Sequence, residues 1–113
     1  MRQAFKIAEA EAWAAAKARG RYDGSALDRA DGYIHLSGPD QLAETARRHF
    51  AGRDGLVLVT LDAEGIGDVR WEPSRGGALF PHLYGPLDPG LALAERPFAV
   101  DADGTCDLPE LGE

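Results

Sequence analysis

A run of six residues near the middle of the chain, Leu56–Leu61, is apolar at every position except Thr60. A strand with one face in water alternates polar and apolar residues, so an almost unbroken apolar run is typical of a strand covered on both faces. The run therefore predicts a central, buried strand. Because a chain of 113 residues can bury only one such core, we expect a single domain.

Two helical patterns precede this strand. Residues 8–19 are rich in alanine, with acidic residues at the start and basic residues at the end, which suits the helix dipole. Gly20 follows at the position of a C-terminal cap. In the second pattern Ser37 is the expected N-cap, and apolar residues recur every four positions from Leu42 to Phe50.

The strands are predicted from short alternating or apolar segments that end at glycine, proline or aspartate. Because the two helical patterns come early and most of the strands come late, we predict an α+β fold with a mainly antiparallel sheet. The expected strands are residues 5–7, 33–36, 56–61, 69–72, 80–84 and 91–98.

The end of the chain differs in charge from the rest. Residues 99–113 hold five of the 19 acidic residues and no basic one, whereas the preceding residues carry 14 acids against all 12 bases. We expect one domain over residues 1–100 and an acidic, disordered tail over 101–113. The nearly neutral domain lacks the basic footprint of an extended nucleic-acid surface, and no apolar run is long enough for a membrane span. A cytoplasmic protein is the default expectation.

Two polar and aromatic segments hold the candidate functional residues. In the first, Asp-Gly-Tyr-Ile-His-Leu-Ser at residues 31–37, strand alternation places Tyr33, His35 and Ser37 on one face. A histidine beside a hydroxyl group at a helix N-terminus can bind a sugar hydroxyl or a phosphate oxygen. The alternative is that His35 bonds only a neighbouring loop and that Ser37 only caps its helix.

The second segment, residues 71–86, surrounds a glycine-rich turn. Arg75 on that turn can hold a phosphate or carboxylate with two parallel hydrogen bonds. His82 and Tyr84 share one face of their strand, where their rings can stack on a flat ligand. The alternative is that the aromatic residues are core anchors and that Arg75 and Glu72 form a structural ion pair. We predict that His35, Arg75 and His82 converge on one cleft.

Other chemistry has less support in the sequence. The single cysteine, Cys106, excludes an intramolecular disulfide and a multi-cysteine metal site. The three histidines are widely spaced, with no carboxylate at a ligand-like spacing, so no metal is expected. No glycine-rich phosphate loop, nucleophile elbow or zinc-protease motif is present in the sequence.

The two segments resemble the signatures of a family catalogued as domain of unknown function 952. The similar stretches are residues 31–37 and Phe-Pro-His-Leu-Tyr-Gly-Pro at residues 80–86, and the resemblance covers about residues 4–98. That family is grouped, more distantly, with the ADP-ribosyltransferase-like fold. The resemblance therefore implies a small α+β domain whose split antiparallel sheet cradles NAD in a central cleft.

The resemblance also implies roles for individual residues. His35, followed by a hydroxyl residue two positions later, matches the histidine that binds the ribose hydroxyls of NAD, and His82 or Tyr84 matches the ring that stacks on nicotinamide. The two-histidine pattern resembles the branch that includes the RNA 2′-phosphotransferases, and Glu95 is a weak counterpart of the late glutamate of other transferases. The implied function is an enzyme acting on NAD or on an ADP-ribose or 2′-phosphate nucleotide; the alternative is a non-catalytic module that binds a nucleotide or phosphometabolite. The expected catalytic residues are His35 and His82, and the expected cofactor-binding residues are Tyr33, Ser37, Glu72, Arg75 and Tyr84.

Overall fold

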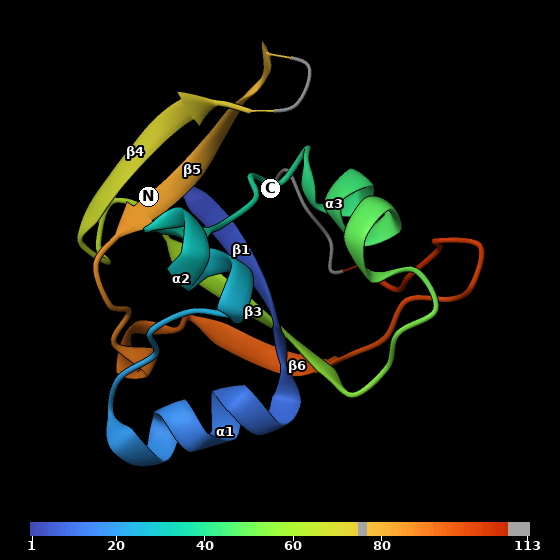
Figure 1. Cartoon of the computed structure of the whole chain (residues 1–113), viewed down its shortest axis with the longest axis horizontal. Coiled ribbons are helices and arrows are strands. Elements are labelled where there is room, and N and C mark those ends of the chain that lie inside the picture. The colour runs from blue at the N-terminus through green and yellow to red at the C-terminus, as the bar shows by residue number, and fades with distance from the viewer. Residues whose placement is uncertain (75–76, 109–113) are drawn as a thin grey trace.

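A computed structural model describes residues 1–74 and 77–108 of the chain, so the predicted site residue Arg75 lies outside the described residues. The described residues form two three-stranded antiparallel sheets and three α-helices (Figure 1). This confirms the expected α+β class with antiparallel sheets. The elements are β1 (Gln3–Glu9), α1 (Ala10–Arg19), α2 (Ala26–Asp31), β2 (Ile34–His35), α3 (Leu42–Phe50), β3 (Leu56–Asp62), β4 (Asp68–Pro73), β5 (Leu79–Tyr84), the 3-10 helix η2 (Pro89–Leu91) and β6 (Ala94–Phe98).

The first sheet has the order β1-β3-β6, so the apolar run of the sequence is the central strand, as predicted. Side chains of β3 alternate between two hydrophobic clusters on opposite faces of this sheet. Val59 and Leu61 pack with Trp13 of α1, whereas Leu58 packs with Leu42 of α3. The two helices therefore cover opposite faces of β3, which explains why the run contains almost no polar residue.

The second sheet has the order β2-β5-β4 and carries the two predicted motifs. In β2, Ile34 is buried in the first cluster, while His35 points to the opposite face and lies directly across from His82 of β5. The two sheets meet where the main chain of Phe5 and that of Ser37 exchange two hydrogen bonds, of 2.8 and 2.9 Å. This junction brings β1 beside the histidine-bearing segment.

The helices differ from the sequence prediction in three ways. The first helix starts at Ala10, two residues later than expected, because residues 8 and 9 still pair with β3. A third helix, α2, forms within residues 21–32, whose glycines and aspartates predict a loop, or a loop with one helical turn. The N-cap role of Ser37 is wrong: α3 has Gln41 at its N-cap position, since the main chain of Ser37 pairs with β1. None of the helices that the structure describes is long and apolar enough to cross a membrane.

Residues 101–108, which we expected to belong to a disordered tail, form a turn that packs on the domain. The amide of Gly52 donates to the carbonyl of Asp101 at 2.9 Å, and Val100 pairs with Cys106 across the turn. Cys106 and Leu108 pack against the second hydrophobic cluster, next to α3. The acidic composition of residues 101–108 thus conceals a few apolar contacts, and the rest of the expected tail, residues 109–113, lies outside the described residues.

Candidate functional site

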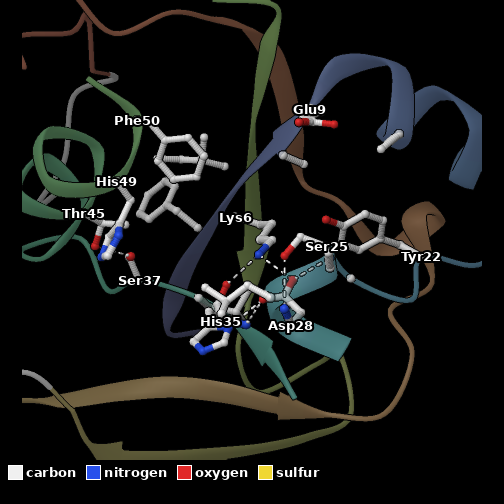
Figure 2. Close-up of a pocket in the computed structure, with 18 of the residues that line it drawn as sticks. Lys6, Glu9, Tyr22, Ser25, Asp28, His35, Ser37, Thr45, His49 and Phe50 are labelled. Carbon is white, nitrogen blue, oxygen red and sulfur yellow. Dashed lines mark hydrogen bonds and ion pairs between the residues drawn. The ribbon is translucent and has the colours of Figure 1, made fainter. Parts of the chain in front are cut away.

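A pocket of about 680 Å³ lies between β1, α2, α3 and the distal end of the β4–β5 hairpin (Figure 2). Its volume is within the range of small-molecule sites, roughly 300–1,000 Å³. Three predicted site residues, His35, Ser37 and His82, line it. Lys6 and Asp28 line it as well, although the sequence analysis did not select them.

Asp28 is the centre of the hydrogen-bond network at this pocket. It is only 2% exposed, and its Oδ2 accepts hydrogen bonds from Lys6 Nζ at 2.7 Å and from the main-chain amide of Ser25 at 2.8 Å. Its Oδ1 accepts from the main-chain amide of His35 at 3.1 Å and lies 2.6 Å from Nδ1 of the same residue. Burial alone would raise the pKa of Asp28, but the hydrogen bond with His35 and the charge of Lys6 lower it well below its usual range.

Lys6 is a charged side chain in the floor of the pocket, and only 6% of it is exposed. Its Nζ donates to Asp28 and, at 3.2 Å, to the main-chain carbonyl of His35. Burial lowers the pKa of Lys6, and the carboxylate of Asp28 opposes that change. The two residues form a buried ion pair that fixes one wall of the pocket relative to the other.

The imidazole of His35 lies between two carboxylates. Nδ1 contacts buried Asp28, and Nε2 lies 3.0 Å from Oδ2 of Asp31, whose side chain is 43% exposed at the end of α2. About a third of the His35 side chain remains accessible to the pocket and to solvent. Asp28 therefore fixes the Nδ1 side of the His35 ring, while the rest of the side chain stays partly accessible.

His82 is held by a carboxylate in the same way. Its Nδ1 lies 2.8 Å from Oε1 of Glu72 on the neighbouring strand β4, and the hydroxyl of Tyr84 donates to that oxygen at 2.7 Å. The hydrogen bonds of His82 and Tyr84 lower the pKa of Glu72. The His82 and His35 rings lie 5.7 Å apart, between centroids, so these two predicted residues do converge.

Tyr33 covers one face of the His82 ring. The two rings are stacked with centroids 4.1 Å apart and an interplanar angle of 23°. Because only 4% of the His82 side chain is exposed, its ring offers a flat ligand little surface for stacking. Tyr33, Glu72 and Tyr84 are not among the lining residues of the pocket: Tyr33 and Glu72 contact His82, and Tyr84 bonds Glu72.

Several other candidates occupy positions away from the histidine pair. Glu95 of β6 accepts hydrogen bonds from Trp13 Nε1 at 3.1 Å and Lys17 Nζ at 2.6 Å, and it does not line the pocket. His49 of α3 is exposed and lines the rim of the pocket near Thr45 (Figure 2). Among residues 1–74 and 77–108 no three metal-ligating side chains are arranged so that they could hold a metal ion together.

One signal in the sequence points to a missed residue, Asp28. Lys6 has none, because a polar residue between Phe5 and Ile7 fits the alternation of an ordinary half-exposed strand. Ser25 and Asp28 have the spacing of a capping box, and both hydrogen bonds of that motif are present. That pattern predicts α2, and with it the position of Asp28 in its first turn.

The arrangement gives the site a definite chemistry. A histidine whose Nδ1 is bound to a carboxylate directs its Nε2 outward, where it can accept a hydrogen bond or move a proton. Here two such histidines face each other on neighbouring strands. They offer two adjacent polar groups at one end of a pocket whose other side is lined by Phe5, Phe50 and Phe80.

Comparisons with known proteins agree with the architecture. The family model described as "Protein of unknown function (DUF952)" matches residues 7–93. The X-ray crystal structure of protein CC0527 from Caulobacter crescentus is 49% identical, with 93% of each chain covered and a TM-score of 0.87. The solution NMR structure of CC0527 is 50% identical over 92% of this chain and 90% of that one, with a TM-score of 0.80. The search of curated proteins gives no match.

Proposed function

We propose that this chain, which belongs to the DUF952 family of proteins of unknown function, binds a ribonucleotide of the NAD or ADP-ribose type in its pocket and acts on the ribose. The observation that carries the proposal is the pair His35 and His82. Each has Nδ1 bound to a carboxylate, and the two rings face each other at one end of the pocket.

A ribose is a suitable partner for such a pair. Its two neighbouring hydroxyl groups can each donate a hydrogen bond, and two carboxylate-bound imidazoles can each accept one through Nε2. Asp31 now lies against Nε2 of His35, but its exposed side chain can rotate to accept a hydroxyl proton itself. The apolar side of the pocket then accommodates the flat part of the nucleotide.

If NAD is the substrate, the bond between the ribose carbon and the nicotinamide nitrogen breaks and its electron pair leaves with nicotinamide. The positive charge that develops on the ribose needs a nearby negative group. Glu95 is bound elsewhere, and Asp28 and Glu72 are each bound to Nδ1 of a histidine, so exposed Asp31, beside Nε2 of His35, is the carboxylate that we propose for this role. Water or an acceptor hydroxyl or phosphate then attacks the ribose and, where it carries a proton, releases it to His35 or His82.

The test is a titration of isotope-labelled protein with NAD, ADP-ribose and a 2′-phosphorylated RNA dinucleotide, followed by NMR, with release of nicotinamide measured in parallel. We expect saturable shifts at the amides of His35, Ser37 and His82. Replacing either histidine by alanine should weaken binding roughly tenfold, the effect of losing one hydrogen bond in a buried site. Glu95→Gln is the matched control and should bind like the wild type.

The outcomes separate the alternatives. Binding with release of nicotinamide supports an enzyme, whereas saturable binding without turnover supports a non-catalytic module. If none of the three nucleotides shifts the pocket amides, the proposal is wrong. Equal loss of binding in Glu95→Gln and in the histidine variants would place the site elsewhere in the domain.

A further inference from the structure

We propose that Asp28 is the positioning residue of His35: it holds the single proton of the neutral imidazole on Nδ1 and thereby directs the Nε2 lone pair to the ligand. The use of that lone pair by a ribose rests on the proposed function. The position of the proton does not, because it can be measured in the protein without a ligand.

Two carboxylates compete for this proton. A neutral imidazole has one N–H group, which can point either to Asp28 or to Asp31. Oδ1 of Asp28 lies 2.6 Å from Nδ1, and Oδ2 of Asp31 lies 3.0 Å from Nε2. The first contact is buried and the second is exposed, so water screens and competes with the second far more strongly.

The position of the Asp28 carboxylate is fixed on both sides. Lys6 and the amide of Ser25 bind Oδ2, and the main-chain amide of His35 binds Oδ1. Oδ1 of Asp28 thus contacts both the imidazole ring and the main-chain amide of His35. The hydrogen bond from the amide keeps the carboxylate in the orientation in which Oδ1 can also accept the N–H of the ring.

Lys6 keeps Asp28 in its ionised carboxylate form. A protonated Asp28 could donate to Nδ1, which would place the imidazole proton on Nε2 instead. The ammonium group of Lys6, 2.7 Å from Oδ2, favours the carboxylate, and together with the hydrogen bond of His35 it outweighs burial and holds the pKa of Asp28 well below its usual range. Lys6 therefore acts on His35 through Asp28.

The same geometry predicts the effect of an isosteric change. In Asp28→Asn one oxygen is replaced by an NH₂ group, while Lys6, Ser25 and His35 all still present donors. The remaining oxygen best faces the ammonium group of Lys6, because that contact carries a charge. The NH₂ group then replaces Oδ1, so the hydrogen bond from the main-chain amide of His35 is lost, and it donates to Nδ1, which moves the proton of the ring to Nε2.

The experiment measures the imidazole nitrogen and carbon shifts of ¹⁵N- and ¹³C-labelled protein with the ring of His35 in its neutral form. In the wild type we expect the Nδ1–H form of His35 to exceed the Nε2–H form by about tenfold or more, which corresponds to about 1.4 kcal/mol. Asp31→Asn should leave that ratio unchanged. Asp28→Asn should reverse it, and Glu72→Gln should change the ratio of His82 and not that of His35.

The result is decisive even if Asp28→Asn does not fold. A wild-type His35 with its proton on Nε2, or an Asp31→Asn variant that moves the proton, overturns the proposal. A folded Asp28→Asn variant that is less stable but keeps the proton on Nδ1 shows that Asp28 is only structural. None of these readings depends on whether a nucleotide binds, so the proposed function stands or falls separately.

Discussion

At the residue scale, Lys6 and Asp28 form an ion pair in which both charges are almost completely buried. Removing two charges from water costs several kcal/mol each, and breaking such a pair leaves one charge uncompensated. We therefore expect Lys6→Met and Asp28→Asn each to lower the free energy of unfolding by about 3–5 kcal/mol. The double variant should lose clearly less than the sum of the two single losses. Urea denaturation of the four proteins measures this, and additive losses would contradict it.

The same pair predicts how stability depends on acid. In the folded protein the pKa of Asp28 is lowered, while an aspartate in the unfolded chain titrates at about 3.9. The unfolded state therefore takes up a proton that the folded state refuses, so the contribution of Asp28 is complete above about pH 5 and is lost as the pH falls through 4 and below. The double variant lacks this carboxylate and should show a shallower loss over the same pH range.

Individual residues differ in how far the sequence could predict their roles. The shared direction of Tyr33 and His35, and that of His82 and Tyr84, follows from strand alternation, which is a local property. The contact of Lys6 with Asp28 joins residues 22 positions apart on a strand and a separate helix. Periodicity carries no information about such a distance, so the two charged residues looked like ordinary surface positions.

At the scale of elements, the contact between the turn at residues 101–108 and α3 predicts the effect of a glycine substitution. Gly104 has a φ of +91°, and a Cβ atom placed on it would lie 2.5 Å from Cγ of Arg47 on α3. Gly20, after α1, has a φ of +78° but open space around the same atom. Both Gly→Ala changes meet the left-handed penalty of about 1–2 kcal/mol, and only Gly104→Ala also displaces α3.

We therefore expect Gly104→Ala to lower the free energy of unfolding more than Gly20→Ala does. Thermal or urea denaturation of the two variants beside the wild type provides the comparison. Equal losses would mean that the turn does not press on α3. Amide shifts of α3 residues in Gly104→Ala would locate the disturbance directly.

The elements also show where sequence patterns are reliable. The apolar run of β3 correctly predicted a central strand, because a strand covered on both faces carries apolar residues at nearly every position. Ser37 was assigned as a helix cap because serine, glycine, proline and aspartate in succession favour a helix start. Its main chain instead pairs with Phe5, more than thirty positions away, and the helix begins only at Leu42. A long-range strand contact thus displaced a local preference.

At the scale of the whole molecule, β3 joins the two hydrophobic clusters into one unit. Leu58 belongs to the cluster under α3, and Leu61 to the cluster under α1. Both side chains are at most 2% exposed. Leu58→Ala and Leu61→Ala should each cost about 2–5 kcal/mol, the usual range for a buried leucine. Leu93→Ala, at an exposed position, is the control and should cost little.

Because the clusters share one strand, neither half should remain folded when the other is weakened. The fluorescence of Trp13, in the first cluster, and NMR signals from Leu42, in the second, should follow the same transition in both leucine variants. Two separate transitions would show that the clusters unfold independently. A loss below about 1 kcal/mol for Leu58→Ala would place β3 at an exposed edge.

The junction between Phe5 and Ser37 gives the molecule a seam. Each residue is at most 4% exposed, each lines the pocket, and each extends a different sheet, so their two mutual hydrogen bonds join the main chains of the two sheets. Any widening of the pocket along this line must break those bonds first. The rate at which the amide protons of Phe5 and Ser37 exchange with solvent is consequently a gauge of how often the seam opens. A small molecule that contacts both sheets should keep these hydrogen bonds closed. Its binding should therefore slow the amide exchange of Phe5 and Ser37.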